Sequence, residues 1–231
     1  MVGGWRLATG WAAASRQLPT ANRQLPSGIR SWSDGRILKE AARPYELVVI
    51  GCSKGGMAAL EKIFTVLPAE FAVPIVVALH RYRTSGEALP SFLREHSKLS
   101  VVDATDKQWI HPGHIYLAPA DYHLLVDRGE LSLSVDSAVA YSRPSIDVLF
   151  ESAADAYLAG LVGVVLTGSN ADGARGVARI KQRGGFVIAQ DPATAEAPEM
   201  PRAAVASGRV DRILPLDRIG PFLVELCRNH G

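Results

Sequence analysis

One short segment near residue 50 restricts the possible folds of this chain more than any other. The apolar run at residues 47–50 is typical of a buried strand, and it stops at Gly51. The residues Gly51-Cys52-Ser53-Lys54-Gly55 follow, and a helical pattern begins directly after them. They fit G-x-S-x-G, a sharp strand-to-helix turn that exposes a serine oxygen above a sheet. The segment therefore predicts an α/β fold with Ser53 as a candidate nucleophile.

Apolar runs and helical patterns alternate along most of the chain. Runs typical of buried strands lie at residues 47–50, 74–79, 161–166 and 186–189, and shorter strands are predicted at 101–102 and 212–214. Helices are predicted at residues 57–67, 85–96, 145–157, 173–183, 201–207 and 216–228. This alternation predicts a doubly wound, mostly parallel sheet.

One region interrupts this alternation. Residues 115–117, 123–126 and 131–135 are predicted to form antiparallel strands, and Asp127-Arg128-Gly129 has the composition of a hairpin turn. The predicted fold class is therefore α/β, a doubly wound and mostly parallel sheet with an inserted antiparallel hairpin.

The first part of the chain differs from the rest in composition. Residues 1–43 are rich in Gly, Ala, Ser, Arg and Pro, and the tetrapeptide Arg-Gln-Leu-Pro occurs in them twice. We predict a disordered tail over residues 1–43 and a folded domain over residues 44–231. Arg6 and Arg16 interrupt the apolar stretch, which disfavours a secretory signal. A transit peptide and sequence upstream of the true start are the other interpretations of the tail.

Charge and cysteine content exclude several classes of protein. Residues 1–33 hold four arginines and no acidic residue, so the net charge of +2 leaves −2 for the remaining residues. Such a balance argues against a nucleic-acid surface, and no apolar run is long enough for membrane insertion. Cys52 and Cys227 form neither a disulfide framework nor a metal-binding pattern. A cytoplasmic location is the simplest expectation.

Three polar residues follow predicted buried strands. Ser53 follows the strand at 47–50, His80 comes directly after residue 79, and Asp172 lies in the loop after residue 166. Ligands of doubly wound sheets bind beyond the carboxyl ends of the strands, so these side chains should meet at one edge. Serine, histidine and aspartate are the nucleophile, the general base and the orienting carboxylate of a hydrolytic triad.

Each of the three residues also has a structural alternative. Ser53 can cap the helix that follows it, His80 can be a surface histidine at a strand end, and Asp172 can cap the helix predicted from Gly173. Their coincidence at one predicted edge favours the catalytic interpretation.

The other histidines and Cys52 are weaker candidates. His111 and His114 are close in sequence, but no carboxylate or thiol cluster accompanies them, so no metal site is expected. His96 and His123 are predicted to have solvated or structural roles. Cys52 should point toward the core, because it precedes Ser53 in the strand.

Three familiar site patterns do not fit. A Walker A loop needs Lys followed by Ser or Thr after its last glycine, whereas Lys54 precedes Gly55-Gly56, and G-x-G-x-x-G is absent. The triad order in α/β-hydrolases is Ser, acid, His, whereas the order here is Ser, His, Asp.

Seven segments, taken in order, match one protein family. They are Gly51-Cys52-Ser53-Lys54-Gly55-Gly56, the strand ending at His80, residues 112–119 (PGHIYLAP), 142–150 (SRPSIDVLF), 166–173 (LTGSNADG), 189–191 (AQD) and 200–204 (MPRAA). Together they resemble the catalytic domain of the chemotaxis protein-glutamate methylesterase family, CheB, from about residue 47 to residue 226. The resemblance implies the fold described above.

The resemblance also implies an activity. Members of the family are hydrolases that remove methyl groups from glutamate side chains of chemoreceptors and release methanol, often with glutamine deamidase activity as well. The family's triad falls on Ser53, His80 and Asp172, and no metal or organic cofactor is needed. The implied partner is a methylated chemoreceptor or a receptor-like signalling protein.

Three departures from the family pattern stand out. Lys54 follows the nucleophile where a small residue or threonine is common, and Ser169 stands where methionine is frequent. The backbone N–H groups of Lys54 and Ser169 are the expected oxyanion donors, and a backbone donor survives a change of side chain. The family usually carries a phospho-receiver domain of on the order of 120 residues, which residues 1–43 do not resemble. A stand-alone paralogue is therefore expected.

Two other functions are compatible with the sequence. A hydrolase of the same fold can act on another ester or amide, which a methanol-release assay would distinguish. A non-catalytic CheB-like module can instead bind a signalling partner, in which case Ser53 would not react with a fluorophosphonate.

Overall fold

A parallel β-sheet of seven strands forms the centre of the fold. The computed structural model describes residues 45–81, 88–139 and 141–228. The strand order is β10-β9-β8-β1-β2-β5-β3, and all neighbouring strands are parallel. Their bounds are β1 Leu47–Cys52, β2 Ile75–Leu79, β3 Ser100–Asp103, β5 His114–Leu117, β8 Leu161–Val165, β9 Phe186–Gln190 and β10 Arg212–Leu214. The predicted α/β class is confirmed.

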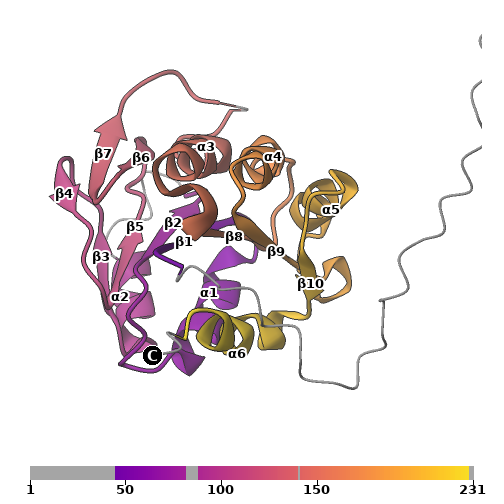
Figure 1. Ribbon diagram of the computed structural model, residues 1–231, viewed down its shortest axis with the longest axis horizontal. Helices are drawn as coiled ribbons and strands as arrows, with labels where there is room; N and C mark the ends of the chain where they lie inside the picture. The colour runs from indigo at the N-terminus through magenta and orange to yellow at the C-terminus, as the bar shows by residue number, and fades with distance from the viewer. Residues whose placement is uncertain (1–44, 82–87, 140, 229–231) are drawn as a thin grey trace, which may run out of the picture. The chain divides into compact units, whose positions relative to one another are not determined.

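Helices cover both faces of the sheet (Figure 1). One face carries α1 (Gly56–Val66), α2 (Ala88–Glu95) and α6 (Leu216–Leu226), and the other carries α3 (Ile146–Tyr157), α4 (Ala174–Gln182) and α5 (Glu199–Ala206). Single-turn helices occupy Leu158–Gly160 and Pro192–Thr194. Alternate β1 residues enter opposite cores, Ile50 with α1 and Val49 with α3. Every β1 residue is buried, as expected for a parallel strand with helices on both sides.

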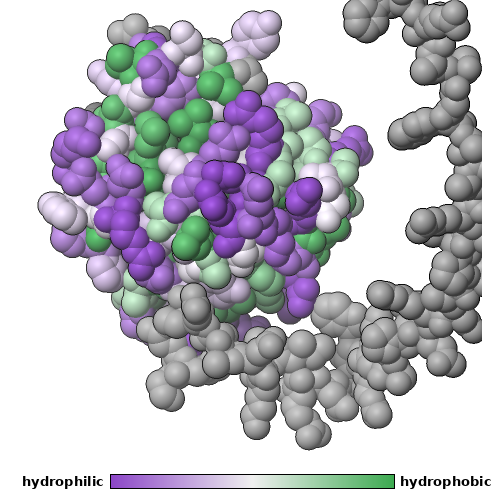
Figure 2. Space-filling model, turned by 45° about the horizontal axis from the view of Figure 1, so that its top comes forward, coloured by the Kyte–Doolittle hydropathy of each residue, from purple (hydrophilic) through white to green (hydrophobic). Residues whose placement is uncertain are grey.

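The outer surface of α3 and α4 is strongly charged. Arg179 and Arg183 of the α4 region both pair with Asp155 of α3, and Arg175 pairs with Glu151. Figure 2 brings this face toward the viewer and shows hydrophilic side chains across its centre. These exposed pairs favour a solvated face and add little stability each.

The antiparallel part of the fold differs from its prediction. β6 (His123–Asp127) and β7 (Glu130–Ser134) form the predicted hairpin, and the unpredicted two-residue strand β4 (Gln108–Trp109) joins it. The assignment of residues 115–117 to this antiparallel group was wrong, because β5 pairs in parallel with β2 and β3. All three residues are buried, a pattern typical of a parallel strand covered on both faces.

The helices begin and end within a few residues of their predicted bounds. Residues 85–87 of one predicted helix and the tail at residues 1–43 lie outside the described part of the chain. Met57, in the first turn of α1, is 46% exposed. Within the described residues, none of the helices has the length and apolar character needed to cross a bilayer.

The strand order places three chain segments beside one another. β1 lies between β2 and β8, and hydrogen bonds continue past the strand ends. The N–H of His80 donates to the Cys52 carbonyl (3.1 Å), and the N–H of Ser53 donates to the Thr167 carbonyl (2.9 Å). The residues that follow β1, β2 and β8 are therefore held at one edge of the sheet, where doubly wound folds bind ligands.

Candidate active site

Ser53 lies on a tight turn between β1 and α1. The N–H of Gly56 donates to the Ser53 carbonyl (2.8 Å), and Gly55 adopts a left-handed conformation with φ of 78°. A Cβ on Gly55 would also lie 2.8 Å from Glu196, so the turn requires glycine here. Gly55 is the N-cap of α1, and the Ser53 side chain does not cap that helix. The structural alternative for Ser53 is therefore wrong.

Buried polar groups hold this turn through hydrogen bonds. The Thr167 hydroxyl donates to the Lys54 carbonyl (2.8 Å) and accepts from the N–H of Ala197 (2.9 Å). The N–H of Thr167 in turn donates to Oε1 of Gln190, a fully buried side chain at the end of β9. The loops after β1, β8 and β9 are thus connected through one network. It fixes the Lys54–Gly55 peptide, and the hydrogen bond from the Gly56 N–H to the Ser53 carbonyl fixes the peptide that carries the Lys54 N–H.

His80 and Asp172 meet at the same edge. Nε2 of His80 lies 2.8 Å from Oδ2 of Asp172, and their side chains are 13% and 0% exposed. The surface-histidine alternative for His80 is therefore wrong. The helix-cap alternative for Asp172 is also wrong, because α4 starts after Gly173 without a side-chain cap.

Asp172 binds the N-terminus of α3 rather than that of its own helix. It accepts hydrogen bonds from the Ser145 hydroxyl and from the N–H groups of Ile146 and Asp147. Burial alone would raise the pKa of Asp172, but the hydrogen bonds from His80, Asp147 and Ile146 outweigh it and hold the pKa below its ordinary value. The carboxylate is therefore charged at neutral pH and can fix the imidazole of His80.

The lowered pKa of Asp172 predicts how stability depends on pH. The ionised Asp172 carboxylate contributes fully to the free energy of unfolding above the ordinary aspartate pKa of about 4. This contribution is lost as the pH falls through the lower pKa that Asp172 has in the folded protein. The difference in unfolding free energy between wild type and Asp172→Asn should therefore shrink below about pH 4. Denaturant titrations over a pH series measure it.

Asp147 supplies a matched control of opposite sign. Burial raises its pKa, opposed by a hydrogen bond from the Gly176 N–H. The wild type should therefore gain stability relative to Asp147→Asn as the pH falls toward 4, since the buried anion becomes neutral. Parallel pH profiles for the two variants would contradict both assignments.

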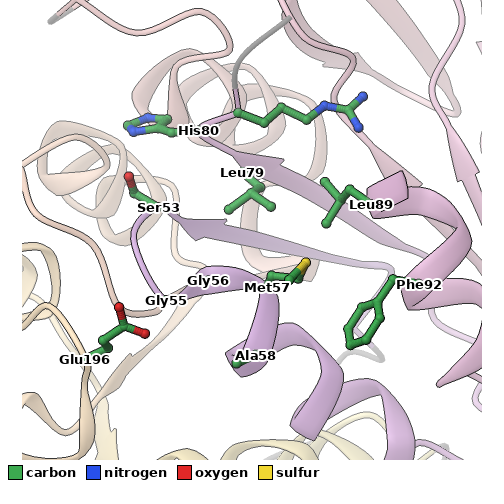
Figure 3. A pocket seen from close by; sticks show the side chains of 11 residues that line it. Ser53, Gly55, Gly56, Met57, Ala58, Leu79, His80, Leu89, Phe92 and Glu196 are labelled. Atoms are coloured by element: carbon green, nitrogen blue, oxygen red, sulfur yellow. The ribbon is translucent and has the colours of Figure 1, made fainter. Parts of the chain in front are cut away.

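The hydrogen bond to Asp172 determines which ring nitrogen of His80 is a base. Since Asp172 is anionic, Nε2 carries the proton and donates it, which leaves Nδ1 as the free acceptor. The Ser142 hydroxyl lies 3.5 Å from Nδ1. Figure 3 shows the Ser53 oxygen pointing toward the His80 ring, although within the described residues the Ser53 hydroxyl makes no hydrogen bond. Such contacts commonly tighten only when substrate binds.

A pocket opens beside Ser53 and His80 (Figure 3). Its volume is about 630 Å³, which is enough for a side chain and part of its backbone. Most of its wall is apolar, with Met57 from α1, Leu79 from β2, and Leu89 and Phe92 from α2. Glu196 lies at the Gly55 side of the pocket.

The two predicted oxyanion donors are free to bind a ligand. Within the described residues, the N–H groups of Lys54 and Ser169 donate to no acceptor. The Lys54 side chain is exposed, so it leaves the turn undisturbed. A Cβ on Gly168 would lie 2.5 Å from the Met200 side chain and 3.0 Å from that of Ser53. The backbone before Ser169 therefore approaches the serine closely.

The weaker candidates stay outside this site. Cys52 is buried in the core, as predicted, and burial raises the pKa of its thiol far above the ordinary value. His111 and His114 lie with ring centroids 6.0 Å apart, and His114 stacks on Tyr116. No group of three or more potential metal ligands occurs in the part of the chain that the structure describes.

The structural role predicted for His123 as one of two alternatives is confirmed, whereas Arg81 was missed from the sequence. His123 is 2% exposed, accepts from the Ser145 N–H through Nδ1 and contacts the Ser137 carbonyl through Nε2. It thereby holds the segment that donates to Asp172. Only its apolar neighbours in the hairpin signalled burial. Arg81, directly after His80, also lines the pocket and gave no signal beyond its position.

A comparison with models of known protein families shows which family the chain belongs to. The model of the family described as CheB methylesterase matches residues 48–223. The chain belongs to the CheB methylesterase family. The resemblance inferred from the seven sequence segments is thus confirmed.

Individual relatives agree with this assignment. A Leptospira interrogans protein, named for protein-glutamate methylesterase and protein-glutamine glutaminase activity, is 42% identical over 188 residues, 80% of this chain and 97% of its own length. Protein-glutamate methylesterase FrzG of Myxococcus xanthus is 39% identical over 79% of this chain and 55% of its own length. The crystal structure of the Thermotoga maritima CheB methylesterase catalytic domain matches with a TM-score of 0.75 and 35% identity, covering 78% of this chain and 98% of that one.

Proposed function

We propose that this CheB-family protein hydrolyses methyl esters of glutamate side chains in a signalling protein, with Ser53 as nucleophile, His80 as base and Asp172 as orienting carboxylate. A methylated chemoreceptor or receptor-like protein is the proposed partner, and a cytoplasmic location is the proposed setting. Deamidation of glutamine by the same route, with ammonia as the leaving group, is included in the proposal.

The first half-reaction forms an ester with the enzyme. The Ser53 oxygen attacks the carbonyl carbon of the methyl ester, and its proton passes to Nδ1 of His80. The tetrahedral intermediate collapses when His80 returns this proton to the departing methoxy oxygen. Methanol leaves, and the glutamyl group stays bound to Ser53.

Water completes the reaction. Nδ1 of His80 takes a proton from a water molecule as its oxygen attacks the acyl carbon, and it then returns the proton to the Ser53 oxygen. Asp172 stays ionised throughout and stabilises the imidazolium that forms in each step. The products are the free enzyme and a glutamic acid side chain, which loses its proton to solvent and becomes a carboxylate.

The N–H groups of Lys54 and Ser169 are proposed to hold the oxyanion of both intermediates. Neither N–H donates to an acceptor among the described residues, and the Gly56 N–H holds the Ser53–Lys54 peptide in place through the Ser53 carbonyl (2.8 Å). Loss of one such donor typically costs about 3 kcal/mol of transition-state stabilisation.

The observation that carries the proposal is the 2.8 Å contact between a buried, anionic Asp172 and Nε2 of a histidine that shares a pocket with Ser53. An assay of methanol release tests it, with peptides that contain glutamate γ-methyl ester and a panel of small esters as comparison. We expect release from the methylated peptides at a higher kcat/KM than from any small ester. Hydrolysis of the small esters alone would contradict the proposed substrate.

A further inference from the structure

Arg81 is a buried cation in the wall of the pocket. Its side chain is 6% exposed and lines the pocket together with Ser53 and His80. Nη2 donates to Oδ1 of Asp103 at 2.7 Å. Nε and Nη1 are buried and have no hydrogen-bond partner among the residues that the structure describes. The guanidinium is thus paired through Nη2, and its other two nitrogens are left without an acceptor in the described part of the chain.

Such an arrangement is unfavourable for the protein alone. A buried charge needs compensating partners, and each buried N–H group without an acceptor costs stability. Asp103 compensates only in part, because its side chain is 31% exposed and accepts from Nη2 alone. A ligand that brings an acceptor with negative charge would satisfy the remaining donors.

The charged side chains in the pocket wall favour an anion at one place and oppose it at another. Arg81 is the only lysine or arginine among the described residues that line it, and its neighbours Leu79, Leu89 and Phe92 offer no acceptor side chain. Glu196 lies at the Gly55 side of the pocket and would repel an anion. An acidic group of the substrate is therefore favoured near Arg81.

We propose that Arg81 forms a subsite for a second carboxylate of the substrate, carried by an acidic side chain near the methylated glutamate in the same segment. The proposal rests on the methylesterase activity proposed above. Nε or Nη1 donates to the incoming carboxylate after a small rotation of the guanidinium brings that nitrogen to the pocket surface, while Asp103 keeps Nη2 in place. Because the pocket wall around Arg81 is mostly apolar, the charge-assisted hydrogen bond forms largely out of water, where it is strong. Arg81 thus selects an acidic segment as substrate.

A peptide series with both ends blocked tests this subsite. Each peptide contains one glutamate γ-methyl ester and either Glu or Gln at one position within four residues on either side. For wild type we expect at least one position at which Glu raises kcat/KM about tenfold or more over Gln, mainly through KM. In Arg81→Gln this preference should fall to about one. Arg81→Lys should retain part of it, because the charge is kept without the planar fork.

Arg183→Gln is the matched control for the loss of one positive charge. Arg183 follows α4 and pairs with Asp155 of α3, on the face of the sheet opposite α1 and α2, and it does not line the pocket. Its substitution should therefore leave the Glu-to-Gln preference unchanged. In Asp103→Asn the preference should rise, since the competing acceptor loses its charge, and this variant decides the question if Arg81→Gln does not fold.

The outcomes separate this subsite from the proposed activity. Hydrolysis of the peptides by wild type without preference at any position would overturn the subsite alone. A preference that persists in Arg81→Gln, or stays unaltered in Asp103→Asn, would also overturn it. Failure of wild type to hydrolyse every peptide would instead contradict the proposed methylesterase activity.

Discussion

Substitution of Ser53 by alanine should lower kcat/KM for a methylated glutamate peptide by a factor of about 10⁴ or more. The variant loses the oxygen that is proposed to attack the ester, and neither His80 nor the proposed oxyanion donors can replace it. Folding should be little changed, because the Ser53 hydroxyl makes no hydrogen bond within the described residues. Methanol release and thermal unfolding, measured on the same preparation, test both statements.

Ser100→Ala is a suitable control for the Ser53 substitution. Ser100 is exposed at the amino end of β3, whereas the pocket lies beyond the carboxyl ends of the strands. Its hydroxyl makes no hydrogen bond in the described structure. The Ser100→Ala variant should have the same activity as the wild type. A folded Ser53→Ala protein with wild-type activity would rule out Ser53 as the nucleophile.

Asp172→Asn should be the second large effect, with kcat lowered by a factor of about 10⁴. An asparagine amide next to Nε2 of His80 donates where the carboxylate accepts. The proton of the imidazole then moves to Nδ1, and the ring can no longer accept the serine proton. Single-turnover rates and thermal unfolding, compared with wild type, measure the loss.

The same substitution should also destabilise the fold, and its control separates the two effects. Oδ2 accepts from Ile146 and Oδ1 from Asp147, so either orientation of the amide sets its NH₂ group against a backbone N–H. Asp147→Asn changes a neighbouring buried carboxylate that does not contact His80, and we expect less than about tenfold loss in kcat from it. Equal losses in the two variants would show that Asp172 acts only through the fold.

The sequence predicted the part of the fold that depends on local pattern. Continuous apolar runs such as residues 161–166 identified the strands of the parallel sheet, because such runs are buried on both faces. Residues 115–117 were misassigned since their neighbours in sequence form a hairpin, whereas their partners in the sheet, β2 and β3, are determined by tertiary packing. The short strand β4 has too few residues to show any period.

In the candidate site, too, the features that depend on local pattern were predicted and those that depend on tertiary packing were not. Ser53, His80 and Asp172 were predicted because each follows a buried strand, and the rule for parallel sheets places such residues at one edge. The contacts of Arg81 with Asp103 and of Thr167 with Gln190 were not predicted. They join residues that are 22 and 23 positions apart in the chain, and no local periodicity signals them. Which donors remain unpaired can only be learned from packing.

Mapping the site of a covalent fluorophosphonate adduct tests the central claim most directly. Attack by the Ser53 oxygen on phosphorus, with loss of fluoride, should add one phosphonyl group to the intact protein, and peptide mass spectrometry should locate it on Ser53. Labelling should be lost in Ser53→Ala and slowed strongly in Asp172→Asn. A folded wild-type protein that stays unlabelled while it hydrolyses the methylated peptide, or one labelled at another residue such as Ser142, would contradict the account.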